Sequence, residues 1–160
     1  MDSQLPTITI NPPPVLTCTD DFTILETIII GDITGFDILW TTVDGNIVSG
    51  ENTLAPTVDA DGTYVLTLEN GAMGGCVVSE QVVVTEDMDG PMPDIQTPDE
   101  LTCGNSSTIL DASSSTGNGV LGAMWSTTDG NIVSGGNTLT PIVNQAGTYT
   151  LVLSQSSNGC

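Results

Sequence analysis

The sequence predicts an all-β protein made of two tandem β-sandwich modules. Three observations predict this class: the composition, an internal duplication, and an alternation of apolar and polar residues. Val, Ile, Leu and Thr are abundant, aromatic residues make up 4% of the 160 residues, and Gly and Pro are scattered between apolar segments. Such a composition is typical of strands joined by many turns.

The duplication defines the modules. Asp44–Gly50 recurs letter for letter as Asp129–Gly135, at an offset of 85 residues. Other identical pairs keep this offset: Leu16–Cys18 with Leu101–Cys103, Trp40 with Trp125, Asn52–Leu54 with Asn137–Leu139, Pro56 with Pro141, and Gly62–Tyr64 with Gly147–Tyr149. This period is typical of a small β-sandwich and not of a helical solenoid. We therefore predict modules at residues 1–87 and 88–160, with Glu86–Pro91 as an acidic linker.

Comparison of the two copies indicates which side chains face inward. Within one predicted strand every second residue is the same in both copies, whereas the residues between them differ. The retained side chains are Tyr64, Leu66 and Leu68 and their counterparts Tyr149, Leu151 and Leu153. Retention with a period of two is typical of a half-buried strand. We expect Trp40, Tyr64, Trp125 and Tyr149 to be structural core residues.

Turn residues divide each copy into short strands. Seven are expected in copy one: Thr7–Ile10, Phe22–Ile30, Phe36–Val43, Asn46–Ser49, Thr53–Val58, Gly62–Glu69 and Cys76–Thr85. Five are expected in copy two: Ser107–Ala112, Ala123–Thr128, Asn131–Ser134, Thr138–Val143 and Gly147–Ser154. This number of strands indicates an immunoglobulin-like sandwich. Copy two stops before any counterpart of Val77–Asp87, so its last strand is missing within this chain.

The repeated Asp-Gly dipeptide predicts a hairpin in each copy. Asp44-Gly45 lies between Trp40 and Gly50, and Asp129-Gly130 repeats it. Asp-Gly tolerates the positive φ angles of a two-residue hairpin turn, so we expect a turn here and not a ligand site.

Several short motifs resemble a known family. Leu110–Ser115, Met124–Gly130 and Gly147–Leu151 resemble a PKD-type domain. The Leu-Thr-Cys opening, the Trp, the Gly-Thr-Tyr and the Asn158-Gly159-Cys160 ending resemble tandem Ig-like or PKD-like repeats of large Bacteroidetes surface proteins. The resemblance covers both copies, implies a secreted adhesin, stalk or filament, and transfers no catalytic residue. One difference is that Leu66 stands where immunoglobulins carry a Cys.

The charge balance excludes several functions. The chain has 20 acidic side chains and no Lys, Arg or His, which gives a net charge of −20. Nucleic-acid binding and a basic membrane-surface patch both require cationic side chains. Without His or Lys there is no imidazole base or Schiff-base amine, so only carboxylate chemistry remains. No pair of acids is placed across a cleft as a glycosidase requires, and no apolar run spans a bilayer. We expect no enzyme.

The four cysteines predict disulfides in an oxidising compartment. The simple pairing is Cys18–Cys76 and Cys103–Cys160, within each copy. In an immunoglobulin-like sandwich, however, Cys18 and Cys76 lie near opposite poles, so a bond between Cys18 and Cys160, or its equivalent between subunits, competes with it. Spacing leaves the pairing open. No CxxC pair or His accompanies the cysteines, which argues against zinc.

Acidic loops make Ca²⁺ the one cofactor the sequence suggests, because Ca²⁺ prefers several oxygen ligands. The candidate ligands are Asp59, Asp61, Glu86, Asp87 and Asp89. Copy two has Asn144 and Ala146 opposite Asp59 and Asp61, and no complete EF-hand loop is present, so solvated loop acids are the simpler interpretation.

Together these patterns predict a non-catalytic, extracellular tandem-repeat segment that forms a rod, stalk or filament. Its expected partners are further copies of the repeat or neighbouring subunits. A carbohydrate-binding module that recognises cell-surface glycans is the alternative, although such sites usually carry exposed aromatics. The missing strand has two explanations: the chain is a segment of a longer array, or a neighbour donates the strand, with Pro6–Ile10 as the candidate donor.

Overall fold

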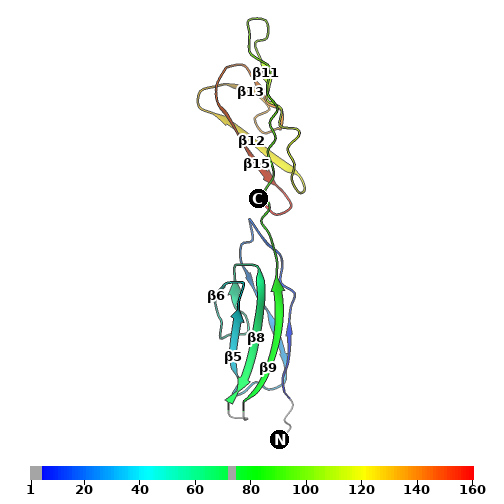
Figure 1. The fold of residues 1–160 in the computed structure, drawn as a ribbon, viewed down its shortest axis with the longest axis vertical. Helices are drawn as coiled ribbons and strands as arrows, with labels where there is room; N and C mark the ends of the chain where they lie inside the picture. Colours follow the sequence, from blue (N-terminus) through cyan, green and yellow to red (C-terminus); the bar gives the residue numbers. More distant parts are fainter. Residues whose placement is uncertain (1–4, 72–74) are drawn as a thin grey trace. The chain divides into compact units, whose positions relative to one another are not determined.

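The computed structural model describes residues 5–71 and 75–160, and their regular structure is β-strand. The chain divides into two compact units, Met1–Asp87 and Met88–Cys160. Strands β1 to β10 belong to the first unit and β11 to β15 to the second (Figure 1). No helix in the described part of the chain is long and apolar enough to cross a membrane.

One sheet of the first unit is built around its longest strands. β8 (Gly62–Asn70) lies between β5 (Asp37–Thr42) and β9 (Cys76–Val84), and all three are antiparallel (Figure 1). In this register Tyr64 is opposite Val82. After β9 the chain continues into β10 (Glu86–Asp87), which pairs in parallel with β2 (Leu16–Thr17).

The second sheet of this unit consists of shorter strands. β1 (Thr7–Ile10) pairs with β4 (Thr27–Ile30). β7 (Thr57–Val58) lies between β3 (Thr23–Ile24) and β6 (Ile47–Ser49). Because β3 and β4 are successive parts of one segment, the order is that of the four-stranded sheet of an immunoglobulin domain, and β5–β8–β9 is its three-stranded partner. The first unit is therefore an immunoglobulin-like β-sandwich.

The core of the first unit lies between these sheets. Its buried apolar side chains come from both sheets: Ile8, Leu16, Leu25, Trp40, Val58, Tyr64, Leu66, Leu68 and Val84. In β8 the buried residues are every second one, as the comparison of the copies predicts. Each fully buried large apolar side chain stabilises the fold by about 1.5–3 kcal/mol.

The second unit repeats this arrangement with fewer strands. β14 (Ile142–Val143) lies between β11 (Thr108–Ile109) and β13 (Ile132–Ser134). β12 (Leu121–Thr127) pairs with β15 (Tyr149–Gln155), which correspond to β5 and β8. The buried cluster is smaller and consists of Leu110, Ala112, Trp125 and Val143. No strand in the described residues occupies the position that β9 has in the first unit.

Some predicted strands are shorter in the structure. The predicted Thr53–Val58 is reduced to β7 because Thr53 closes a turn on the Gly50 carbonyl, through its amide at 2.9 Å and its hydroxyl at 2.8 Å. The predicted Phe22–Ile30 is divided into β3 and β4. The acidic segment expected to be a linker begins instead with β10.

The predicted Asp-Gly hairpin is wrong. β5 and β6 flank Asp44-Gly45 but belong to different sheets, and neither residue has a positive φ. Instead, the Asp44 carboxylate accepts a hydrogen bond from the Thr63 amide at 2.9 Å. Gly45 is required for space, because a Cβ there would lie 2.4 Å from the Tyr64 hydroxyl oxygen. The second unit repeats both features at Asp129 and Gly130.

Candidate functional site

The shared residues of the two units build the same structural corner. The Tyr64 hydroxyl accepts a hydrogen bond from the Asn46 amide at 2.9 Å and donates to the Ala60 carbonyl at 2.8 Å. Tyr149 forms the equivalent bonds with the Asn131 amide at 2.9 Å and the Gln145 carbonyl at 2.6 Å. These bonds tie the loop before β8 or β15 to the loop that follows β5 or β12.

The indole nitrogens also have structural partners. Trp40 Nε1 donates to the Thr53 carbonyl at 2.9 Å, and Trp125 Nε1 donates to the Thr138 carbonyl at 3.0 Å. Both indoles are buried, whereas Tyr149, unlike Tyr64, is only half-buried. Burial raises the pKa of Tyr64 above its ordinary value, because the charged phenolate would be poorly solvated there.

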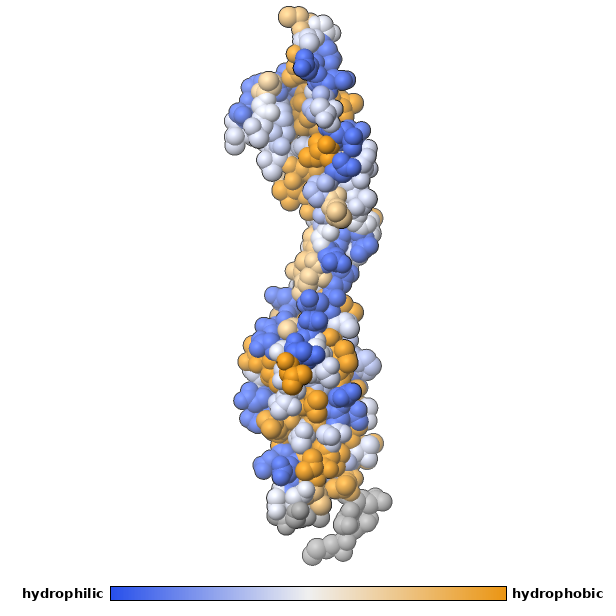
Figure 2. Space-filling view, in the orientation of Figure 1, coloured by the Kyte–Doolittle hydropathy of each residue, from blue (hydrophilic) through white to orange (hydrophobic). Residues whose placement is uncertain are grey.

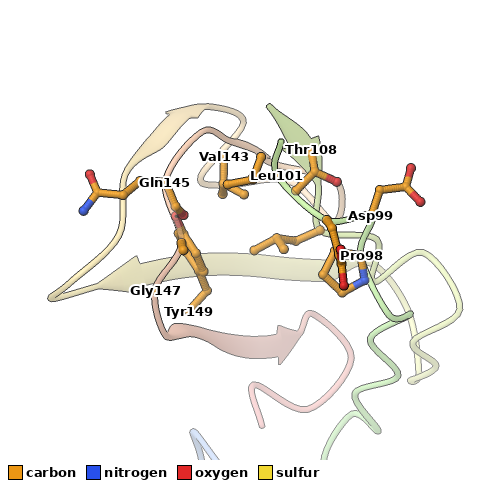
Figure 3. Close-up of a pocket in the computed structure, with 11 residues that line it drawn as sticks. Pro98, Asp99, Leu101, Thr108, Val143, Gln145, Gly147 and Tyr149 are labelled. Atoms are coloured by element: carbon orange, nitrogen blue, oxygen red, sulfur yellow. Dashed lines mark hydrogen bonds between the residues drawn. The ribbon is translucent and has the colours of Figure 1, made fainter. Parts of the chain in front are cut away.

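The second unit contains a groove beside its strand β15. A pocket of about 410 Å³ lies beside β15. Its lining residues come from the segment before β11, from β11 and β14, and from the start of β15: Pro98, Asp99, Glu100, Leu101, Thr108, Leu110, Val143, Gln145, Ala146, Gly147 and Tyr149. Figure 3 shows Tyr149 on one side of this pocket, with Pro98 and Asp99 on the other.

The groove corresponds to the part of the first unit that β9 fills. Leu101, Gly147 and Tyr149 match Leu16, Gly62 and Tyr64 at the offset of the duplication. In the first unit Gly62 and Tyr64 pair with Val84 and Val82. We call the pocket and the adjoining free edge of β15 the strand groove. The sequence indicates an open edge in copy two, but the lining residues depend on packing across the two sheets.

The cysteines correct the simple disulfide pairing. Cys18 and Cys160 are the two disulfide-bonded cysteines. Cys103 is an exposed free thiol, and the bond Cys103–Cys160 is therefore absent. Because Cys103 is not disulfide-bonded, the expectation that all four cysteines form disulfides is wrong. The competing pair, Cys18 with Cys160, is the one whose two members are both bonded.

The topology of the first unit explains why Cys18 does not bond to Cys76. Cys18 directly follows β2, which pairs with β10, and Glu86 of β10 lies ten residues beyond Cys76. At about 3.3 Å per residue, roughly 30 Å separate the two ends of this strand segment. A disulfide requires Cα atoms within about 7 Å.

The predicted calcium ligands do not converge. The Asp59 carboxylate accepts a hydrogen bond from Asn46 Nδ2 at 2.6 Å, and Asp61 is exposed. Glu86 and Asp87 form β10, and the Asp89 carbonyl accepts a hydrogen bond from Asn158 Nδ2 at 3.0 Å. Over residues 5–71 and 75–160 the structure forms no group of three acidic, Cys or His side chains arranged to hold a metal. Calcium binding at these residues stays a prediction.

Comparisons with known proteins give a similarity of fold at low identity. No protein-family model and no curated protein matches the chain. Similar solved structures include the titin domains z1z2 in complex with telethonin, at 16% identity and a TM-score of 0.43, covering 98% of this chain and 92% of that one. The N-terminal Ig1-2 module of Drosophila receptor protein tyrosine phosphatase DLAR has 14% identity and a TM-score of 0.38, covering 98% and 93%. The immunoglobulin-like assignment rests on the strand order of each unit and not on these similarities.

Proposed function

We propose that this chain is a non-catalytic structural segment of an extracellular tandem-repeat protein, whose units act as spacers in a rod, stalk or filament. The main evidence is that the repeated residues form the same structural hydrogen bonds in both units. Asp44, Trp40 and Tyr64 form backbone hydrogen bonds in the first unit, and Asp129, Trp125 and Tyr149 form the same bonds in the second. The duplication therefore preserves architecture, as a repeated spacer requires.

Two of the acidic side chains, Asp32 and Asp111, are stabilised in their charged form by neighbouring hydrogen bonds. Hydrogen bonds from the Thr34 hydroxyl and amide lower the pKa of Asp32, and those from Ser113 lower the pKa of Asp111. A carboxylic acid that donates a proton in catalysis needs the opposite shift, a raised pKa. Figure 2 shows hydrophilic residues scattered over the visible face of each unit. A high net charge of one sign keeps proteins soluble.

The extracellular location rests on the disulfide chemistry and on the family resemblance. Disulfide-bonded cysteines such as Cys18 and Cys160 persist in oxidising compartments and are rare in reducing ones. PKD-like repeats of Bacteroidetes surface proteins, which the chain resembles, are found outside the cell. Its partners would be further copies of the repeat or neighbouring subunits.

Protease treatment of intact cells tests the location. Trypsin has no side-chain target here, so an Asp/Glu-specific protease is added to cells that produce the protein, and an antibody against the chain detects what remains. We expect the signal to disappear from intact cells while a cytosolic control protein persists. Persistence of both until the cells are lysed would contradict an extracellular role.

A glycan array separates the structural role from the carbohydrate-binding alternative. Phe22, at 61% exposure, is the most exposed aromatic side chain in the described residues. We expect no glycan to bind. Binding that is lost in Phe22→Ala, with Phe36→Ala as the comparison variant, would favour the carbohydrate-binding alternative over the spacer.

A further inference from the structure

The segment that contains β3 and β4 is apolar on both of its faces. Its inward side chains include Thr23 and Leu25, which are buried in the first unit. The alternate, outward positions are exposed, and they are Phe22, Ile24, Glu26, Ile28 and Ile30. The four apolar side chains among them are 61, 49, 51 and 69% exposed, in chain order. We call these five outward residues the outer stripe.

The outer stripe crosses the outward face of one sheet of the first unit. Ile28 lies opposite Thr9 of β1, and Ile24 lies opposite Thr57 of β7. An antiparallel sheet with one face in water usually alternates apolar and polar residues, whereas strands covered on both faces are nearly continuous apolar runs. The outer stripe therefore has the composition of a covered face, although it is exposed.

The second unit shows that the fold does not require all of these apolar side chains. Ser107 stands at the position of Phe22, and it is exposed. Ser113 stands at the position of Ile28, and it is exposed too. The inward leucine of the segment is retained as Leu110, which is buried. Because the same segment forms with serine at two of the outward positions, the apolar residues there serve a purpose other than folding.

Carboxylates interrupt and flank the outer stripe. Asp21 directly precedes it, Glu26 lies at its centre, and Asp32 follows two residues after its end. All three are exposed, and the Glu26 carboxylate accepts a hydrogen bond from Asn11 Nδ2 at 3.2 Å. The chain has no Lys, Arg or His side chain to neutralise them. A surface that covers the stripe must therefore supply its own positive charge, because a carboxylate in an apolar contact is costly without a partner.

A second copy of this chain fits the outer stripe poorly. Two stripes packed face to face would bring carboxylates together without any cation, since each copy carries a net charge of −20. Like charges that face each other across an interface weaken it strongly. An anionic membrane surface is disfavoured for the same reason. The electrostatics favour a partner of different composition.

We propose that the outer stripe is the docking surface for a different protein, whose contact surface is apolar and carries at least one Lys or Arg side chain. Its apolar part packs on Phe22, Ile24 and Ile28, and its cation reaches the Glu26 carboxylate. Apolar burial supplies affinity, and the complementary charge selects the partner. Such docking goes beyond the spacer role, because a spacer needs no partner on the face of a sheet.

Site-specific photo-crosslinking tests the proposal in cells that produce the full chain. Phe22 is replaced by the photoreactive analogue p-benzoylphenylalanine, which keeps the aromatic ring, and the matched control carries the same analogue at Ser107. Crosslinked products are cut with an Asp/Glu-specific protease and identified by mass spectrometry. We expect position 22 to crosslink to another polypeptide with roughly tenfold higher yield than position 107, at a peptide that combines apolar residues with Lys or Arg.

Three further substitutions in the chain that carries the analogue at position 22 separate the contacts. Ile28→Ser copies the residue of the second unit and Glu26→Lys reverses the central charge, so each should lower the yield about tenfold. Val83→Ser removes a side chain of 57% exposure from the other sheet of the same unit and should leave the yield unchanged. All three positions are exposed, and hydrogen exchange of β8 in each purified variant checks that the first unit remains folded.

Several results would overturn the proposal. One is a yield at position 22 no higher than at position 107, and another is equal loss in Ile28→Ser and Val83→Ser. A product with another copy of this chain would show that the stripe pairs copies, and a product with a lipid or a glycan would show that it does not receive a protein. A partner peptide without Lys or Arg, or an unchanged yield in Glu26→Lys, would contradict the role of the charge.

Discussion

Removing one hydroxyl group tests how far identical residues depend on their neighbours. In Tyr64→Phe the Asn46 amide and the Ala60 carbonyl lose partners at 2.9 and 2.8 Å. Because Tyr64 is 0% exposed, water cannot easily replace them. Leaving buried polar groups unpaired costs about 1–3 kcal/mol, and we expect the free energy of unfolding of the first unit to fall by this amount.

Tyr149→Phe removes the same hydroxyl from the second unit and is the matched comparison. Tyr149 is only half-buried, so water can bond to the Asn131 amide and the Gln145 carbonyl. We expect a smaller loss, about 0.5–1 kcal/mol. Hydrogen exchange of peptides from β8 and β15, measured across a urea titration, gives a separate unfolding curve for each unit. An equal or larger loss in Tyr149→Phe would refute the argument from burial.

Gly45→Ala places a Cβ 2.4 Å from the Tyr64 hydroxyl oxygen and should cost the first unit about 1–3 kcal/mol, whereas Gly90→Ala, with no atom within 4 Å, should be neutral in the same urea titration. Because the pKa of Tyr64 is raised in the folded state, its contribution to the stability of the first unit is complete below about pH 10, the ordinary tyrosine value. That contribution is lost as the pH rises through the folded-state pKa, since the unfolded tyrosine ionises first. Urea midpoints of the first unit measured from pH 8 to 12 should show this decline, and Tyr64→Phe should lack it. In the native oxidised protein iodoacetamide should modify Cys103 but not Cys18 or Cys160, which should react only after reduction, as peptide mass spectrometry can show.

The duplication made much of the fold predictable from the sequence. Two copies of one strand act as an alignment: side chains that stay the same at every second position, such as Tyr64, Leu66 and Leu68, are the ones buried in β8. The short strands were harder to predict. β7 contains only Thr57 and Val58, because the Thr53 turn interrupts the apolar pattern before it. Local sequence does not show which carbonyl a threonine will bind.

The Asp-Gly motif shows why local rules can fail. The dipeptide fits a hairpin turn, and no neighbouring residue argues against one. Its actual role depends on Thr63 and Tyr64, about twenty residues later, which bond to Asp44 and limit the space at Gly45. The cysteine pairing failed for the same reason, since Cys18 and Cys76 are brought to opposite ends of the unit by the parallel pairing of β2 with β10.

Identical side chains in the two units differ in how deeply they are buried. Tyr64 and Tyr149 have the same hydroxyl partners, yet one is buried and the other half-buried, because β9 covers the first and no described strand covers the second. Leu66 and Leu151 differ in the same way. Along β15 the inward-facing positions are half-buried and alternate with exposed ones. These positions keep the Leu and Tyr of β8, so a side chain that is identical in the two copies indicates which way it faces but not how deeply it is buried.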